Sequence, residues 1–419
     1  MRANWADNIS FKAARRHFPK TLSELQEIVH GARRVRMVGA RHSFNDIADT
    51  SGDLICLAEY VDAPCLDSER AEVTVNAGMT YGELGPWLHH NGFALANMAS
   101  LPHVTIAGAC ATATHGSGDE QGNLATAVCA LEFVTAEGEV ETLRRCSSSD
   151  KLEGVAVGLG GFGAITTVTL DVIPTFTMQQ EIYAGLGFSE LYANFDEIMA
   201  SAYSVCLFTD WCKGQIDHLR MKHKLTHGHV QGVAGEFFGA KHARLEETRG
   251  ELSDDWVAKP TGVEGPWYEH LPHFALLKPT APGYEFQTEY FVPRQHAVEA
   301  FRVIEDLHPV FASLITLTEI RSLAADELWM SPSYQQPTIG IHFGWERDWP
   351  AVKKMLPILE DALAPFDARP HWGKLFTMTG ERLEALYQRM SDFRALLLTY
   401  DPSGKFRNAF LERTIFDNP

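Results

Sequence analysis

The sequence lacks the cysteine patterns of a metal or disulfide framework. Its seven cysteines form no C-x-x-C pair, and their number is odd. This usage is typical of a reduced, cytoplasmic chain rather than of a disulfide scaffold or a zinc module. The polar stretch that holds His223, His227 and His229 has no fixed fourth ligand. We therefore expect a cytoplasmic protein without bound metal.

Export signals and long apolar runs are also lacking. Residues 1–8 hold no apolar run behind a basic start, so we expect no signal peptide. The uncharged run 154–170 is too short, and too rich in glycine and threonine, to cross a bilayer. The sequence therefore predicts no association with a membrane.

Basic residues are scarce relative to acidic ones. The chain has 36 lysines and arginines against 54 aspartates and glutamates, which gives a net charge of −18. An acidic surface repels phosphate backbones, so we expect no nucleic-acid partner. The 419 residues, 45% of them hydrophobic, are ample for a two-lobed enzyme with a large core.

A short strand followed by a turn of small residues stands near the N-terminus. Residues 35–38 form an apolar run with valine at both ends, which favours a buried strand, and Gly-Ala follows at 39–40. Successive backbone N–H groups in such a turn can cradle a phosphate, with Arg41 and Ser43 beside them. His42 would then be within reach of a bound cofactor. On its own, the stretch fits an ordinary strand, turn and partly buried histidine better.

A second stretch, residues 97–118, is small and uncharged. From Ala99 to Gly118, fourteen residues are Gly, Ala, Ser, Thr or Cys, and the whole stretch has no Lys, Arg, Asp or Glu. Such a segment packs closely against a large flat group or against other backbone. Its hydroxyls and amides can also hydrogen-bond a cofactor. A tightly packed core helix is the alternative.

Residues 158–163 match the dinucleotide fingerprint G-x-G-x-x-G, but we reject a Rossmann fold. That fingerprint needs a helix after it, so that the helix N-terminus meets the pyrophosphate. Here the β-branched run 164–170 follows, which predicts a strand. We expect these glycines to form a turn close to a cofactor that is bound elsewhere.

Helical and strand patterns alternate along the rest of the chain. After Pro174 the sequence becomes richer in tryptophan, histidine and proline. Helices are predicted at 20–32, 80–91, 294–307, 349–364 and 380–398. Strands are predicted at 54–57, 72–76, 204–207, 283–291, 314–320 and 339–345, with a hairpin over 131–143. The polar segment 222–262 is predicted to be a long surface excursion.

Two of the predicted strands carry charged residues at alternating positions. Glu319 and Arg321 point to one face of their strand, and His342 and Gly344 share a face of theirs. Side by side, such strands would form a polar wall, to which Lys374 of an H-W-G-K piece could add an ammonium. These groups suit a polyhydroxylated substrate, because each can hold a hydroxyl. A solvated sheet face with surface ion pairs is the alternative.

Together these stretches resemble the flavin-dependent oxidases of the vanillyl-alcohol-oxidase type, and most closely the alditol oxidases among them. The resemblance covers nearly the whole chain. The histidine–serine turn and the H-W-G-K piece are shared with aldonolactone oxidases, whereas 97–103 is more particular to alditol oxidases. The residues that carry it are 38–45, 97–103, 111–118, 202–211, 265–267, 271–274, 319–321, 369–374 and 404–410.

The resemblance implies an α+β fold of two domains. An FAD-binding domain of the PCMH type would span 1–177, an antiparallel-sheet cap domain for the substrate 178–377, and a C-terminal segment 378–419 would return to the first domain. FAD would lie with its pyrophosphate on the turn and its ring bonded covalently to His42. The residues implied to line it are Met37, Val38, Gly39, Ala40, Arg41, His42, Ser43, Ser100, Thr105, Gly108, Thr112, Ala113, Thr114, His115, Gly163 and Ile165.

The resemblance also implies a reaction, performed by a monomer. The terminal primary alcohol of a polyol such as xylitol or sorbitol would become an aldehyde, with hydride passing to flavin N5 and O2 reduced to H2O2. Small Ala99, beside Ser100, favours oxidase over dehydrogenase behaviour. The residues implied to act are Lys374, Arg321 and His342 in catalysis, and Ser100, Glu319, Arg321, Gly344 and Lys374 in substrate binding.

One position departs from the family pattern, and two other functions stay open. Gly344 stands where the family has threonine, which predicts a roomier pocket with one hydrogen bond fewer. An aldonolactone oxidase or dehydrogenase of the same superfamily is the first alternative. A catalytically silent flavin- or sugar-binding protein is the second, but it would need no inward lysine and arginine.

Overall fold

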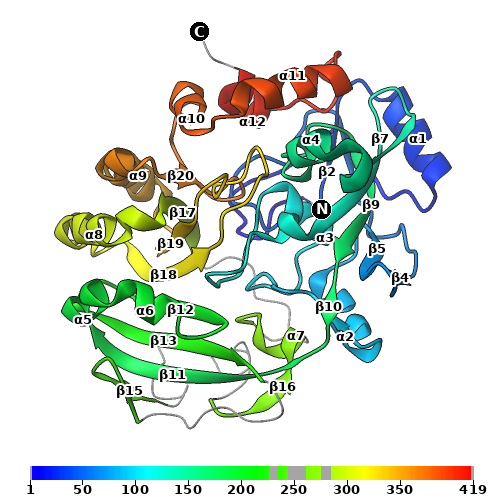
Figure 1. Ribbon diagram of the computed structural model, residues 1–419. Helices are drawn as coiled ribbons and strands as arrows, with labels where there is room; N and C mark the ends of the chain where they lie inside the picture. The colour runs from blue at the N-terminus through cyan, green and yellow to red at the C-terminus, as the bar shows by residue number, and fades with distance from the viewer. Residues whose placement is uncertain (1, 226–234, 244–260, 275–284, 417–419) are drawn as a thin grey trace.

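The computed structural model describes residues 2–225, 235–243, 261–274 and 285–416. His227 and His229, and much of the predicted excursion 222–262, lie outside the described residues. Figure 1 shows two lobes side by side, the early part of the chain in blue and cyan on the right and the later part in green and yellow on the left. The mixture of helices with antiparallel sheets confirms the predicted α+β class.

The early lobe is built on two sheets. A three-stranded parallel sheet has the order β1 (Arg15–His17), β3 (Asp53–Ile55), β2 (Val35–Met37). An antiparallel sheet has the order β4 (Cys65–Asp67), β5 (Glu72–Asn76), β9 (Ala164–Asp171), β7 (Val128–Val134), β8 (Val140–Arg144). The lobe also holds the pair β6 (Phe93–Ala94) and β10 (Ile173–Pro174), and the helices α1 (Leu22–Gly31), α2 (Tyr81–His90), α3 (Ile106–Ala111) and α4 (Arg145–Ala156).

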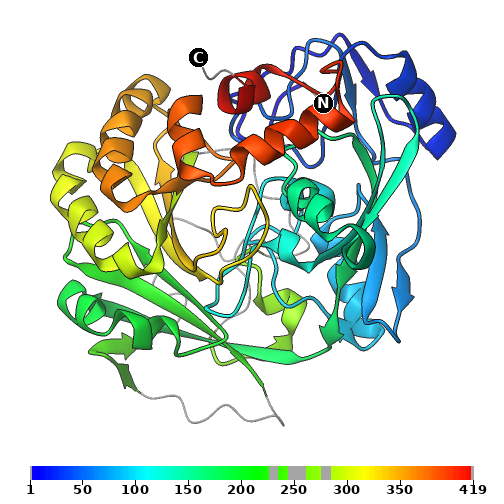
Figure 2. The same ribbon diagram turned by 45° about the horizontal axis from the view of Figure 1, so that its top comes forward.

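The later lobe is built on one ten-stranded antiparallel sheet. Its order is β14 (Glu236–Phe237), β15 (Ala240–His242), β11 (Thr177–Gly187), β13 (Gln215–Lys224), β12 (Ser204–Thr209), β18 (Ile315–Leu323), β19 (Thr338–Trp345), β17 (Phe286–Pro293), β20 (Arg369–Pro370), with β16 (Glu264–Pro266) beside β11. Figures 1 and 2 show one face covered by α5 (Phe188–Ala193), α6 (Phe195–Met199), α8 (Ala297–Phe311) and α9 (Trp349–Leu363).

Alternation along the central strands separates an apolar face from a polar one. Phe343 and Trp345 of β19 stack on each other, and both meet Phe311 of α8 edge-on, so these odd-numbered positions face the helices. His342, next to Phe343 in the strand, lies opposite Glu319 of β18 and faces the other way. The helix-covered face is therefore core, and the opposite face is free to form a polar wall.

The last helices return to the early lobe. They are α10 (Gly380–Leu386), α11 (Met390–Tyr400) and α12 (Ala409–Leu411), while the short α7 (Trp267–His270) lies beside β16. Arg36 of β2 is buried and donates to the backbone oxygens of Phe406, Ile47, Leu159 and Gly160. One side chain thus joins the first strands, the glycine turn and the C-terminal segment.

Most predicted elements are confirmed with shifted ends. The predicted helix 294–307 runs on to Phe311 after a 3₁₀ turn, and 380–398 divides into α10 and α11 around residues 387–389. The expected strand 54–57 is shorter, and residues 283–284 of the expected strand 283–291 lie outside the described residues. None of the helices in the described ranges has the length and apolar character that crossing a bilayer requires.

Candidate active site

A cavity of about 1360 Å³ lies between the early lobe and the polar face of the ten-stranded sheet. The turn after β2 and the small-residue stretch line one side of it, and residues of β17, β18 and β19 line the other. The predicted residues that line it are Met37, Val38, Gly39, Ala40, Arg41, His42, Ser43, Ser100, Thr105, Gly108, Thr112, Thr114, His115, Gly163, Ile165, Glu319, Arg321, His342 and Lys374.

The turn after β2 has the form of an anion-binding nest. Arg41 adopts a left-handed backbone with φ of 66°, and within the described residues the N–H groups of 39–43 donate no hydrogen bond to the protein. A Cβ on Gly39 would lie 2.1 Å from Oγ1 of Thr105, so only glycine allows the turn and α3 to approach this closely. The free N–H groups along the cavity fit a diphosphate.

His42 presents an unpaired imidazole to the same cavity. Its Nδ1 is buried and has no hydrogen-bond partner in the part of the chain that the structure describes, and its ring centroid lies 5.2 Å from that of Trp5. Burial, and then the nearby His103 and Arg41, lower the pKa of His42 to about 4. The ring is therefore neutral at physiological pH, with a nitrogen free for a further bond.

The small-residue stretch forms a short helix between cavity-lining loops. Only Ile106–Ala111 is helical, as α3, so the alternative of a long core helix is wrong for most of 97–118. Thr112 and Thr114 line the cavity, but Ala113 between them does not, because its left-handed backbone (φ 53°) places it in the core. The stretch therefore offers hydroxyls to a cofactor without bulk.

The predicted glycine turn at 158–163 is confirmed. It connects α4 to β9, and Gly160 has a φ of 70°, a conformation that glycine adopts without strain. Leu159, Gly160 and Gly163 line the cavity. A strand follows the turn rather than a helix, so the rejection of a Rossmann fold is confirmed.

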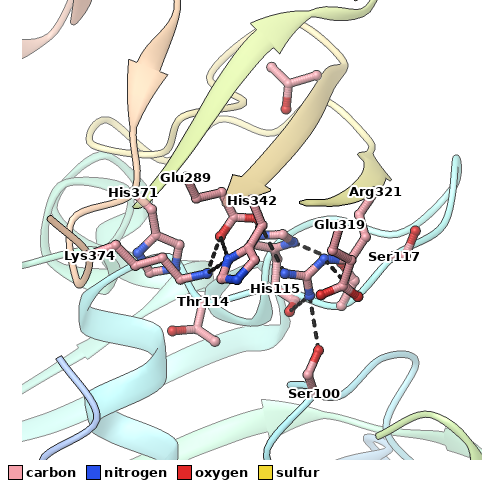
Figure 3. A network of polar contacts seen from close by, with 12 residues as sticks. Ser100, Thr114, His115, Ser117, Glu289, Glu319, Arg321, His342, His371 and Lys374 are labelled. Atoms are coloured by element: carbon pink, nitrogen blue, oxygen red, sulfur yellow. Dashed lines mark hydrogen bonds and ion pairs between the residues drawn. The ribbon is translucent and has the colours of Figure 1, made fainter. Parts of the chain in front are cut away.

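The polar wall places three charged or ionisable residues in one cross-strand row. Glu319 of β18 and Glu289 of β17 both lie opposite His342 of β19, which stands between them. Figure 3 shows these side chains converging with Lys374 and Arg321. All of them lie away from bulk water, because Glu319, Arg321, His342 and Glu289 are buried. The alternative of a solvated sheet face is therefore wrong.

Glu289 is the centre of this network. Its Oε2 lies 2.6 Å from Nζ of Lys374, and its Oε1 lies 3.1 Å from Nε2 of His115 and 3.3 Å from a terminal guanidinium nitrogen of Arg321. Burial would raise the pKa of this carboxyl, but Lys374, His115 and Arg321 hold it well below its usual range. Glu289 is therefore a buried anion with a cation on either side.

Lys374 enters the network from the loop after β20. Two hydrogen bonds hold its Nζ, 2.6 Å to Glu289 and 2.5 Å to Nδ1 of His342. Burial lowers the pKa of Lys374, and Glu289 partly offsets this effect. Burial and the charge of Lys374 lower the pKa of His342 to about 3, so this imidazole is neutral.

Arg321 and Glu319 extend the network toward the small-residue stretch. The Arg321 guanidinium donates to Oγ of Ser100 over 3.1 Å, and its Nε lies 3.6 Å from Oε1 of Glu319. His273 places Nδ1 2.9 Å from the same Glu319 oxygen. The predicted residues Ser100, Glu319 and Arg321 are therefore brought together on one side of the cavity.

Glu289, His371 and His273 were not predicted from the sequence. Glu289 alternates with the polar residues Glu285 and Gln287 in the expected strand 283–291, and this alternation is the signal that could have found it. His371 lines the cavity, and its Nδ1 accepts from the backbone N–H of Gly373 over 3.0 Å. His273 lies outside the predicted strands and gave no periodic signal.

Gly344 does not line the cavity, although its cross-strand partners Gln287 and Leu317 do. A Cβ at this position would lie 2.4 Å from Oε2 of Glu285 and 2.6 Å from Oγ1 of Thr316. The sequence predicts a roomier pocket here, but the structure instead fills the space with the Glu285 carboxylate. Glu285 is therefore a further cavity residue that sequence reasoning missed.

Metal-ligating atoms also come together in this region. In the described residues, ligand atoms of His115, Glu289 and His371 lie within 4.8 Å of one another. Lys374 and Arg321 already pair with Glu289, so its charge is balanced without a metal. These two cations would repel a third one, and the site is better suited to organic molecules.

Comparison with known proteins gives matches along the whole chain. A family profile described as "FAD binding domain" matches residues 13–144, and one described as "D-arabinono-1,4-lactone oxidase" matches residues 283–414. An alditol oxidase from Streptomyces sp. is 38% identical over 413 residues, which is 97% of each chain. An L-gulonolactone oxidase from Mus musculus is 26% identical over 99% of this chain and 98% of its own.

A solved structure gives the same fold at low identity. The crystal structure of cholesterol oxidase from B. sterolicum matches with a TM-score of 0.79 and 15% identity, over 99% of this chain and 96% of the other. This likeness confirms the predicted vanillyl-alcohol-oxidase-type fold, with its FAD-binding domain and antiparallel sheet. With the 38% identity to an alditol oxidase, it shows that the chain belongs to the alditol oxidase family of FAD-dependent oxidoreductases.

Proposed function

We propose that this chain oxidises the terminal primary alcohol of a sugar alcohol, such as xylitol or sorbitol, to the aldehyde, with O2 reduced to H2O2. The observation that carries the proposal is the cluster of Lys374, Glu289, His342 and Arg321 on the wall that faces the anion-binding turn across one cavity. In this proposal residues 1–177 and 378–419 hold FAD, and residues 178–377 hold the substrate.

The early lobe would bind FAD through its backbone and attach it through His42. The free N–H groups of 39–43 fit the pyrophosphate, and the unpaired Nδ1 of neutral His42 fits a covalent bond to the flavin ring methyl. Bound FAD would supply the acceptor for the hydride of the substrate's terminal carbon, at flavin N5, and the route of the electrons to O2. Ala99 lines the cavity beside Ser100 with a small side chain, which leaves the space next to it open.

Lys374 would take the proton of the reacting hydroxyl. Glu289 and neutral His342 both accept hydrogen bonds from its Nζ. In the neutral amine, two hydrogens satisfy these two acceptors, and the lone pair is left for the substrate. Because burial lowers the pKa of Lys374, a larger share of it is neutral than for a lysine in water.

Arg321, Ser100 and Glu319 would orient the rest of the polyol. The Arg321 guanidinium spans Glu289, Glu319 and Ser100, so its position is fixed before substrate binds. It polarises the reacting hydroxyl, while Ser100 and Glu319 bind the neighbouring hydroxyls. Such a fixed set of donors and acceptors sets which carbon faces the flavin.

Peroxide formation tests the substrate class. Peroxide from xylitol or sorbitol supports the proposal, whereas peroxide only from gulono- or galactonolactone supports the aldonolactone oxidase alternative. Lys374→Ala should lower kcat with xylitol at least about a hundredfold while the flavin stays attached. Lys213→Ala, which removes an exposed lysine, is the matched control. Near-wild-type turnover by Lys374→Ala would contradict the assigned role.

Acid precipitation tests the covalent bond. The holoenzyme should give a yellow pellet, and His42→Ala should give a colourless pellet with free flavin in the supernatant. A yellow His42→Ala pellet would contradict attachment at His42. All seven cysteines are unpaired, which supports our further proposal that the protein acts in the reducing cytoplasm.

A further inference from the structure

Glu285 occupies the space that Gly344 leaves open. A Cβ added at residue 344 would lie 2.4 Å from Oε2 and 3.2 Å from Cδ of Glu285. A side chain at 344 would therefore displace the carboxylate. Because Gly344 lies on the same face of β19 as His342, the Glu285 carboxylate faces the cavity with the polar wall.

Two neighbours fix the Glu285 carboxylate in place. Gln287 donates to Oε1 over 2.6 Å, and the Thr316 hydroxyl donates to Oε2 over 3.1 Å. Thr316 lies at an irregularity of the β18–β19 pairing, between Ile315 and Leu317, and all three line the cavity. Each carboxylate oxygen can accept a second hydrogen bond, so both remain available to a ligand.

Within the described residues, Glu285 has no ion-pair partner, unlike the other two wall carboxylates. Glu289 pairs with Lys374 and Arg321, and Glu319 pairs with Arg321. Among the residues that the structure describes, no basic side chain forms an ion pair with Glu285. Burial raises the pKa of Glu285, while Gln287, Thr316 and the charge of Lys374 act in the opposite direction.

Glu285 lies on the same cavity wall as Glu289, just before the first residue of β17. Glu289, which contacts Lys374, stands four residues further along the chain, and Gln287 lies between them. Successive same-face positions on a strand are about 6.6 Å apart, so Glu285 takes no part in the Lys374 hydrogen bonds, although the charge of Lys374 acts on its pKa. An extended polyol that has one hydroxyl at Lys374 and runs along the wall past Gln287 would bring its other end to Glu285.

We propose that Glu285 is a specificity-determining residue, which binds the distal end of the polyol and selects against substrates that carry an anionic group there. This inference rests on the proposed function. The carboxylate accepts hydrogen bonds from distal hydroxyls. It favours a distal ammonium and repels a distal carboxylate, because charge–charge interactions in a partly enclosed cavity are stronger than in water.

Three substrates with the same carbon chain test the proposal. Sorbitol, glucamine and gluconate share a free primary alcohol and differ at the other end, which is neutral, cationic or anionic at neutral pH. In the wild-type holoenzyme we expect kcat/KM to fall in the order glucamine, sorbitol, gluconate. In Glu285→Gln the ratio of kcat/KM for glucamine to that for gluconate should fall at least about tenfold.

A matched variant and a salt series complete the test. Glu299→Gln removes the same charge from the exposed side of α8, on the other face of the sheet, and should leave the ratio unchanged. If Glu285→Gln does not fold, the wild type still provides a test. Added salt should bring its ratio of kcat/KM for glucamine to that for gluconate closer to one by screening the charges, and should change kcat/KM for sorbitol little.

The possible outcomes separate the two proposals. An unchanged ratio in folded Glu285→Gln, or a wild-type ratio that is close to one or does not respond to salt, would overturn the role of Glu285. It would leave polyol oxidation standing, provided that the wild type oxidises sorbitol. If the wild type oxidises none of the three substrates and no other polyol, the proposed function fails, and this inference fails with it.

Discussion

Lys374 and Glu289 form a buried ion pair, with 2.6 Å between Nζ and Oε2, although 85 residues separate them in sequence. The pair fixes the amine that we propose as the proton acceptor, and it also sets how readily that amine loses its proton. Burial lowers the pKa of Lys374 and the Glu289 charge raises it again. The pH dependence of the reaction therefore reports on this contact.

Glu289→Gln should shift the pH profile toward acid. Removing the anion lowers the pKa of Lys374, so the amine becomes neutral at lower pH, and the acid limb of kcat/KM should move down by about 1–3 pH units. The wild-type limb itself should lie below the ordinary lysine value of 10.5, because burial lowers this pKa. The check is a kcat/KM profile with xylitol for both proteins, normalised to flavin content. A limb that does not move, or that moves toward base, would contradict proton transfer to Lys374.

Gly39→Ala should prevent FAD from binding. Its Cβ would lie 2.1 Å from Oγ1 and 3.2 Å from Cβ of Thr105, so the turn would have to move away from α3 and lose its nest geometry. We expect the flavin content of the purified protein to fall at least about tenfold relative to wild type, measured as flavin absorbance per protein. Gly31→Ala is the control, because its Cβ would meet nothing within 4 Å. Normal loading of Gly39→Ala would show that the turn does not hold the pyrophosphate.

Arg36→Met should destabilise the whole chain. Without the guanidinium, the backbone oxygens of Phe406, Leu159 and Gly160 lose this donor, and that of Ile47 keeps only Asn408. We expect a loss of about 3–5 kcal/mol in the free energy of unfolding, measured by urea titration of the loaded protein. Arg33→Met, at an exposed position just before β2, should cost little. Equal midpoints for the two variants would contradict the bridging role of Arg36.

Gly344→Ala should act through Glu285. In the wild-type background the new Cβ displaces the Glu285 carboxylate, and we expect kcat/KM with sorbitol to fall about tenfold. In a Glu285→Ala background the same change should cost less, because the Glu285 carboxylate is absent and only the contact with Thr316 remains. A double-mutant cycle measures this coupling. Additive effects would mean that residue 344 influences the substrate by another route.

Local sequence was sufficient to predict the turn after β2, and to predict which residues of a single strand share a face. The nest depends on consecutive residues after β2, and Glu319 with Arg321 share a face because strand alternation has a period of two. Both features are local, and both were confirmed. The family resemblance then supplied the fold, and most of the site residues that it implies line the cavity.

Strand register and bulges could not be predicted from the sequence. Glu289 acquires its partners only when β17 pairs with β19 in the register that sets it opposite His342. Glu285 fills the space at Gly344, where it accepts a hydrogen bond from Thr316 at the irregularity of the β18–β19 pairing. Both depend on contacts between distant segments, which leave no periodic signal in the chain.

The most direct measurement mixes the anaerobic, flavin-loaded protein with xylitol and follows the flavin's visible absorbance. The account predicts that xylitol bleaches the wild type and that Lys374→Ala, with its flavin still attached, bleaches at least about a hundredfold more slowly. Equal rates for the two proteins, or a wild type that a lactone bleaches and no polyol does, would contradict it.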